Sequence, residues 1–219
     1  MIKEDSSSRE LLTLVFKGFG VLTIAHFIPW FLLKPLLTAI FPSVPENLIS
    51  KLSSSAISPV IASYYMFLKT RQMPKIMRKG ETLYASIAGM VGVWLLTFIM
   101  SLIVGAIDLL NKELVENLST INLAYLFLEM IWSPLVEETL FRGYFLEILR
   151  RWNNVGALLL SSILFTVPHL LTQNIVFGGV DGLLRGIDTF VVSIILGLVY
   201  MQGGLGASIL VHAFANFYR

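Results

Sequence analysis

The chain has 219 residues, of which 56% are hydrophobic and 14% are charged, against roughly 25% charged residues in an average soluble domain. Because the apolar residues are spread over many segments, this composition excludes a soluble enzyme with a single anchor and predicts a multi-spanning membrane protein. The net charge of +2 gives no support for nucleic-acid binding, and the absence of cysteine excludes disulfides, cysteine nucleophiles and thiolate metal sites.

Seven segments approach the length of about 20 mainly apolar residues that a membrane-spanning helix needs. In chain order they are residues 11–33, 54–68, 83–107, 121–149, 155–171, 187–201 and 205–218. The second, sixth and seventh are short, so we expect them to be tilted, re-entrant or partly interfacial. The fourth is too long for one straight span, so we expect Pro134 to kink it unless its first turns lie at the interface.

These segments predict an all-α fold, a polytopic membrane protein with about seven transmembrane helices that enclose a buried polar site. We expect one integral membrane domain over residues 1–219, in which residues 1–120 carry no motif and residues 121–219 form the motif-bearing core. The first ten residues are mostly polar and no small-residue cleavage pattern follows, so a removed signal peptide is not expected.

Basic residues between the second and third segments set the expected orientation. This linker contains one acidic residue, Glu81, and five basic residues: Lys69, Arg71, Lys75, Arg78 and Lys79. The positive-inside rule places such a cluster in the cytoplasm. Counting helices from it places the N-terminus, Arg150 and Arg151 inside as well. The linker 108–120, with the glycosylation sequon at Asn117, and the glycine-rich residues 178–182 are then expected outside.

Glu137 and Glu138 stand side by side in the fourth apolar segment, and Arg142 follows one helical turn later. Ionisable side chains are costly in lipid, so a carboxylate pair inside a span indicates a functional site. Residues four apart share a helix face, whereas neighbours lie about 100° apart. We therefore expect Glu138 to pair with Arg142, which leaves Glu137 on another side to act as a general base. The alternative is a charge network that only ties helices together.

Two further polar motifs occur at helical spacing in later segments. Phe165 and His169 are four residues apart, and Pro168 is expected to loosen the helix and turn His169 inward. His212 and Asn216 share a face of the last segment, where their N–H groups are suited to stabilise an oxyanion. For this last pair, interhelical hydrogen bonding that fixes packing is the alternative.

Together the three motifs supply two carboxylates, an arginine, two histidines and an asparagine, which is the inventory that amide hydrolysis needs. The chain has no Gly-x-Ser-x-Gly motif, no pair of aspartates in separate spans and no His-Glu-x-x-His helix. In this order over apolar helices, Glu-Glu-x-x-x-Arg, Phe-x-x-x-His and His-x-x-x-Asn resemble the CAAX prenyl endopeptidase and bacteriocin-processing family, also called CPBP or Abi. The resemblance runs from about Ser133 to the C-terminus.

The resemblance implies an intramembrane glutamate-dependent endopeptidase with an all-helical fold. Its catalytic set would comprise Glu137, Glu138, Arg142, His169, His212 and Asn216. By this resemblance Glu137 would activate a water that His169 helps to hold. His212 and Asn216 would form the oxyanion hole, while Glu138 with Arg142 would orient the site.

The implied substrate is a hydrophobic or lipidated peptide or protein that is cut near its C-terminus. Phe141 and Phe165 are predicted to line its pocket, with Phe145, Phe177 and Phe214 as further candidates. Two histidines and a glutamate could ligate zinc. The asparagine of the last motif, together with the implied mechanism in which glutamate activates water, favours a site without metal, so we expect no metal and no cofactor. The compact chain shows no organelle-targeting pattern and is expected in a bacterial cytoplasmic membrane, in contact with membrane lipids.

Two other functions remain open. A non-proteolytic scaffold or regulator, or a bacteriocin self-immunity protein of the same family, would keep the polar centre for packing and bind a partner. Such a protein would tolerate Glu137→Gln, which an enzyme would not. A proton-coupled transporter would show repeats or broken helices in both halves. Polar motifs occur only in the C-terminal half, which argues against a transporter.

Overall fold

A computed structural model describes residues 7–42, 44, 49, 57–74, 82–104, 127–176 and 179–218. Within these ranges the chain is helical and contains no β-strand. Among the described residues, four helical stretches are long and apolar enough to cross a membrane: Ser8–Ile40, Thr82–Ile99, Asn154–Leu171 and Gly182–Gly203. The predicted class, an all-α polytopic membrane protein, is confirmed. The linker 108–120 with its sequon lies outside the described residues, as do Lys75, Arg78, Lys79 and Glu81.

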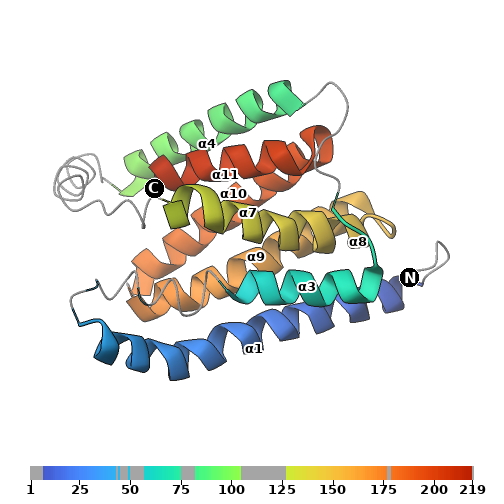
Figure 1. Cartoon of the computed structure of the whole chain (residues 1–219). Helices are drawn as coiled ribbons and strands as arrows, with labels where there is room; N and C mark the ends of the chain where they lie inside the picture. The colour runs from blue at the N-terminus through green and yellow to red at the C-terminus, as the bar shows by residue number, and fades with distance from the viewer. Residues whose placement is uncertain are drawn as a thin grey trace. The chain divides into compact units, whose positions relative to one another are not determined.

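Each of the seven predicted segments overlaps a helix (Figure 1). The first three are α1 (Ser8–Ile40), α3 (Ser58–Thr70) and α4 (Thr82–Val104). The fourth is a continuous helical run of η2 (Leu128–Trp132), α7 (Ser133–Glu138), η3 (Thr139–Leu146) and α8 (Glu147–Leu149). The last three are α9 (Asn154–Val176), α10 (Gly179–Gly203) and α11 (Leu205–Tyr218).

The sixth segment is longer than the sequence indicated. It was expected to be short, but α10 has 25 residues, and the glycines at 179 and 182 belong to its first turn rather than to an outer linker. Glycine lowers helix propensity without forbidding a helix. The second and seventh segments are short as predicted, with 13 and 14 residues.

The chain divides into two compact units that interleave along the sequence. Unit 1 comprises Met1–Lys75 and Leu135–Leu164, and unit 2 comprises Ile76–Pro134 and Phe165–Arg219. The predicted division at residue 120 stays a prediction. Each unit is described by itself below, and the single integral membrane domain stays a prediction.

In unit 1, α1 packs against α3 and α8, and α3 packs against η3 (Figure 1). Gly18 of α1 lies where these elements meet, because a Cβ atom there would stand 2.5 Å from Met66 Sδ and 2.9 Å from Phe145 Cε1. Met66 and Phe145 are fully buried. The missing side chain at Gly18 therefore lets α1 approach both α3 and the motif-bearing helix run closely.

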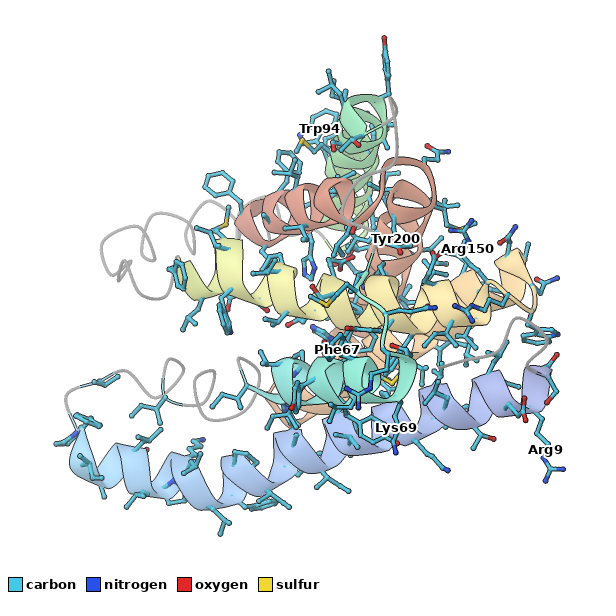
Figure 2. The ribbon with its side chains drawn as sticks, turned by 45° about the vertical axis from the view of Figure 1, so that its right-hand side comes forward. Arg9, Phe67, Lys69, Trp94, Arg150 and Tyr200 are labelled. Carbon is cyan, nitrogen blue, oxygen red and sulfur yellow. The ribbon has the colours of Figure 1, made fainter. Side chains whose placement is uncertain are left out.

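Basic residues gather at one end of unit 1. The N-terminus of α1 with Arg9, the C-terminus of α3 with Lys69, and Arg150 after α8 lie toward the same end (Figure 2). Arg151 also belongs to this end, because its Nη2 donates to Gln72 Oε1 at 2.9 Å. This grouping agrees with the charge pattern from which a cytoplasmic N-terminus is proposed.

Unit 2 is built on three mutually packed helices, α4, α10 and α11 (Figure 1). A Cβ atom at Gly89 of α4 would stand 2.5 Å from Val199 and 2.9 Å from Val211, so the three helices approach closely at this glycine. Tyr200 is buried inside the unit, whereas Trp94 lies on its outside (Figure 2). The buried core consists of Ala85, Val93, Val192, Leu196, Val199, Ala207, Val211 and Ala215. This packing fixes the position of α11, which carries His212 and Asn216.

Candidate active site

The carboxylate pair lies at the end of α7, in unit 1. Glu138 Oε1 is 3.0 Å from Arg142 Nη1, and the two side chains are 0% and 1% exposed. The spacing of four residues predicted this ion pair. Because both charges are removed from water, each depends on the other for its stabilisation.

Glu137 is also buried, with 7% of its surface exposed. It precedes Glu138 on a regular α-helical turn, so its side chain leaves the helix about 100° away from that of Glu138. Glu138 makes the close ion pair with Arg142, while Glu137 leaves the helix in another direction and still interacts electrostatically with Arg142. The role of Glu137 as a base stays a prediction.

Two π-helical stretches flank α7, which the sequence did not indicate. η2 precedes Ser133 and η3 follows Glu138, and η3 carries Phe141 and Arg142. Stretches of π-helix are rare and occur frequently at functional sites. Phe141 is buried and meets Phe145 edge to face, with ring centroids 5.6 Å apart. Its predicted position on the wall of a substrate pocket stays a prediction.

His169 lies on α9, which continues through Pro168 to Val176, so the proline does not end the helix. His169 Nδ1 lies 2.9 Å from the backbone oxygen of Phe165. A carbonyl oxygen only accepts hydrogen bonds, so Nδ1 carries the proton of this contact. In the neutral ring Nε2 is then the unprotonated nitrogen, which can accept a hydrogen bond from water.

Phe165 connects the two histidines of unit 2. Its ring stacks on His169 with centroids 4.6 Å apart and meets His212 edge to face at 5.7 Å. Phe165 and His212 are both buried. The structure therefore brings residues from two separate sequence motifs to one aromatic side chain, as expected if both motifs serve one site.

Asn216 joins α11 to the helix that leads to the carboxylates. Its Nδ2 donates to the backbone oxygen of Glu129, in η2, at 2.8 Å. An interhelical bond of this kind is what the packing alternative predicted for this residue. A primary amide has a second N–H, however, so this contact leaves Asn216 able to donate elsewhere.

The predicted site residues thus form two groups. Glu137, Glu138, Phe141 and Arg142 belong to unit 1, and Phe165, His169, His212 and Asn216 belong to unit 2. The convergence of Glu137 with the histidines stays a prediction. Among the described residues no group of three or more His, Asp or Glu side chains is arranged to hold a metal ion.

A family model described as Type II CAAX prenyl endopeptidase Rce1-like matches residues 119–218. All residues of the three motifs fall inside this range. No curated protein and no solved structure matches the chain.

Proposed function

We propose that the chain, of which residues 119–218 match the Type II CAAX prenyl endopeptidase Rce1-like family model, is an intramembrane endopeptidase in which Glu137 activates water. The observation that carries this proposal is the unequal state of the two adjacent carboxylates. Glu138 is held by Arg142 at 3.0 Å, while Glu137 is buried on another side of the same turn. One carboxylate is therefore structural, and the other is suited to move a proton.

In the proposed reaction a water molecule is held between the Glu137 carboxylate and His169 Nε2. Glu137 takes one proton from the water, and the oxygen of the water bonds to the carbonyl carbon of the substrate peptide. The carbonyl oxygen becomes an oxyanion, and N–H groups of His212 and Asn216 stabilise it. Glu137 then returns the proton to the amide nitrogen as the C–N bond breaks. The products are a new C-terminal carboxylate and a new amine.

The tautomer of His169 supports its part in this reaction. Because Nδ1 donates to the Phe165 carbonyl, Nε2 presents a lone pair that orients one water hydrogen and leaves the other for Glu137. No metal enters the proposed reaction. Phe141 and Phe165 are proposed as apolar walls for a hydrophobic or lipidated peptide. The enzyme is proposed to lie in a bacterial cytoplasmic membrane with its N-terminus in the cytoplasm, and the peptide reaches the site from that membrane.

The proposal is tested with purified protein in detergent. A prenylated CAAX-type peptide and a panel of unmodified hydrophobic peptides are incubated with enzyme, with and without a strong chelator, and the fragments are identified by mass. We expect cleavage near the C-terminus that survives the chelator. Loss of cleavage with chelator and recovery with added zinc would overturn the metal-free mechanism while keeping the site.

Phe165→Leu is expected to lower the turnover number by roughly 10–100-fold while the protein stays folded. Leucine keeps apolar volume but removes the ring contacts with both histidines, and small misplacements of catalytic groups cost about this much. Phe98→Leu is the matched control, because Phe98 belongs to the same unit and is 51% exposed. Equal turnover in the two variants would show that Phe165 does not position the histidines.

A scaffold without protease activity is the second candidate. It is favoured by the Asn216–Glu129 bond, which ties α11 to η2 whether or not a reaction occurs. Such a protein needs this contact and the Glu138–Arg142 pair, but it has no need of a carboxylate at residue 137. The two functions therefore differ in what Glu137→Gln does.

A further inference from the structure

A short segment after α3 connects that helix to the helix run that carries the carboxylates. This segment, residues 71–74, is called the strap here, and it runs from the C-terminus of α3 toward α8 (Figure 1). It begins at Arg71, the only described residue other than glycine with a positive φ, of 54°. A left-handed conformation is unfavourable for such a residue and persists only where its surroundings hold it. We therefore expect specific contacts along the strap.

Three contacts hold the strap, each to a different part of unit 1. The hydroxyl oxygen of Thr70, the last residue of α3, accepts a hydrogen bond from the N–H of Gln72 at 3.2 Å. Gln72 Oε1 accepts another from Nη2 of Arg151, after α8, at 2.9 Å. The ring of Pro74 packs on η3 at Gly143, where an added Cβ atom would stand 2.6 Å from Pro74 Cβ and 2.8 Å from Pro74 Cγ. All these residues belong to unit 1.

Gly143 lies on the turn that contains the buried ion pair. It is buried and directly follows Arg142, and a Cβ atom added to it would lie 3.8 Å from the backbone oxygen of Glu138. A Cβ atom does not approach another heavy atom as closely as 2.6 Å. The ring of Pro74 is fixed to its own backbone and has no flexible end that could swing aside. A side chain at residue 143 would therefore displace either the strap or this turn of η3.

We propose that Gly143 is a positioning residue for the helix run that carries the carboxylates. Because it has no side chain, Pro74 packs directly on η3, and the anchored strap then fixes the turn of Glu138 and Arg142. Glu137 precedes Glu138 on the same continuous run, so its direction depends on the same contact. A catalytic base needs such fixed geometry for its full effect. The effect on turnover rests on the proposed function, whereas the packing of Pro74 on Gly143 does not.

The sign of a change in stability tests the contact. Alanine favours a helix more than glycine does, so Gly143→Ala would raise Tm if Pro74 left room for a methyl group. The close contact predicts the reverse, a fall of roughly 3–10 °C, because the methyl group must displace a packed ring. Gly20→Ala is the matched control, since Gly20 lies inside α1 of the same unit and a Cβ added there meets no neighbour within 4 Å in the described part of the chain. Its Tm should stay at or above that of wild type.

Pro74→Gly provides the rescue, because it removes the ring atoms that the new methyl group would meet. Alone it should lower Tm and kcat only slightly, since a flexible residue replaces a rigid one while the strap keeps its bond to Arg151. In the double variant the alanine at 143 has room. Tm and kcat should therefore return to the values of Pro74→Gly, well above those of Gly143→Ala. Only direct contact between the two residues produces this interaction.

Two further measurements separate positioning from stability. At a temperature where the variant is folded, Gly143→Ala is expected to lower kcat by roughly 10–100-fold with little change in KM. A residue with only a structural role would lower Tm and leave the kcat of the folded protein unchanged. Trypsin should cut the bond between Arg71 and Gln72 at least about tenfold faster in this variant, because a displaced strap opens more often. The fragment that begins at Gln72 is identified by its mass.

The experiment uses the full chain in detergent, with wild type, the two single variants, the double variant and Gly20→Ala. An unchanged Tm and trypsin rate in Gly143→Ala, or additive changes in the double variant, would overturn the contact. If Gly143→Ala gives no folded protein, a folded double variant supports the contact and an unfolded one overturns it. If wild type cleaves no peptide, the proposed function fails, and Tm with trypsin cleavage still decides whether Pro74 needs glycine at 143. If wild type cleaves and Gly143→Ala keeps its kcat, the positioning role fails and the proposed function stands.

Discussion

Replacing Glu137 by glutamine is expected to lower peptide cleavage by at least about 10²–10⁴-fold, the usual contribution of a general base. Glutamine has nearly the shape of glutamate, but it takes no proton from water. Glu137 is buried, and the hydrogen-bonding distance of 3.0 Å to Arg142 belongs to Glu138, although the Arg142 charge acts on both carboxylates. The Glu137→Gln variant should therefore fold like wild type and bind substrate while failing in the chemical step. The rate of fragment release at saturating peptide measures this effect.

Glu147→Gln is the matched control for this substitution. Glu147 belongs to the same helix run, but it is 30% exposed and pairs with Arg150 at 3.2 Å. Its replacement should leave cleavage within about twofold of wild type, since exposed pairs contribute little. Full cleavage by the Glu137→Gln protein would exclude Glu137 as the base. Normal cellular function of that variant in a strain without the native protein would establish the scaffold.

Arg142→Ala should destabilise unit 1 by about 3–5 kcal/mol, the usual cost of removing one partner of a buried ion pair. The loss is large because Glu138 is 0% exposed and would keep a charge without its guanidinium partner. We expect a lower unfolding midpoint and a poor yield of folded protein, measured by thermal or denaturant unfolding in detergent. Cleavage should fall with the folded fraction and further through the loss of site orientation.

Two variants separate the buried charge from other effects of the arginine. The double variant Glu138→Gln/Arg142→Met removes both charges and should recover much of the lost stability, because no charge is then left buried alone. Arg150→Ala breaks a similar pair on the same helix run, but its side chains are 21% and 30% exposed. It should cost no more than about 1 kcal/mol. Equal destabilisation by Arg142→Ala and Arg150→Ala would contradict the buried-pair account.

The sequence predicted the helices well because hydropathy and length determine which segments can span a membrane. The second and seventh segments agree closely with α3 and α11. The error at α10 came from treating a glycine-rich stretch as a linker, although apolar residues on its C-terminal side let the helix extend back through it. The Glu138–Arg142 pair was predictable because one helical turn separates the two residues.

The partner of Asn216 was not predictable from the sequence. Asn216 donates to a backbone oxygen. Every residue has a backbone oxygen, so the sequence does not indicate which one is the acceptor. This carbonyl belongs to η2, which has a π register, whereas the sequence argument assumed regular α-helical spacing throughout this run. Pro134 before the carboxylates is the signal that could have indicated such a register, since a helix accommodates an internal proline by a local change in its hydrogen bonds.

The length of α1 has a consequence for the lipids around the protein. Its 33 residues extend about 50 Å, whereas the hydrocarbon layer is about 30 Å thick. Even a tilt of about 40°, at the upper end for transmembrane helices, leaves part of α1 among the headgroups. Pro29 and Pro35 weaken the helix where it can bend to meet this hydrophobic mismatch. Because α1 packs against α3 and α8, we expect a change in acyl-chain length to alter the packing of the helix run that carries Glu137.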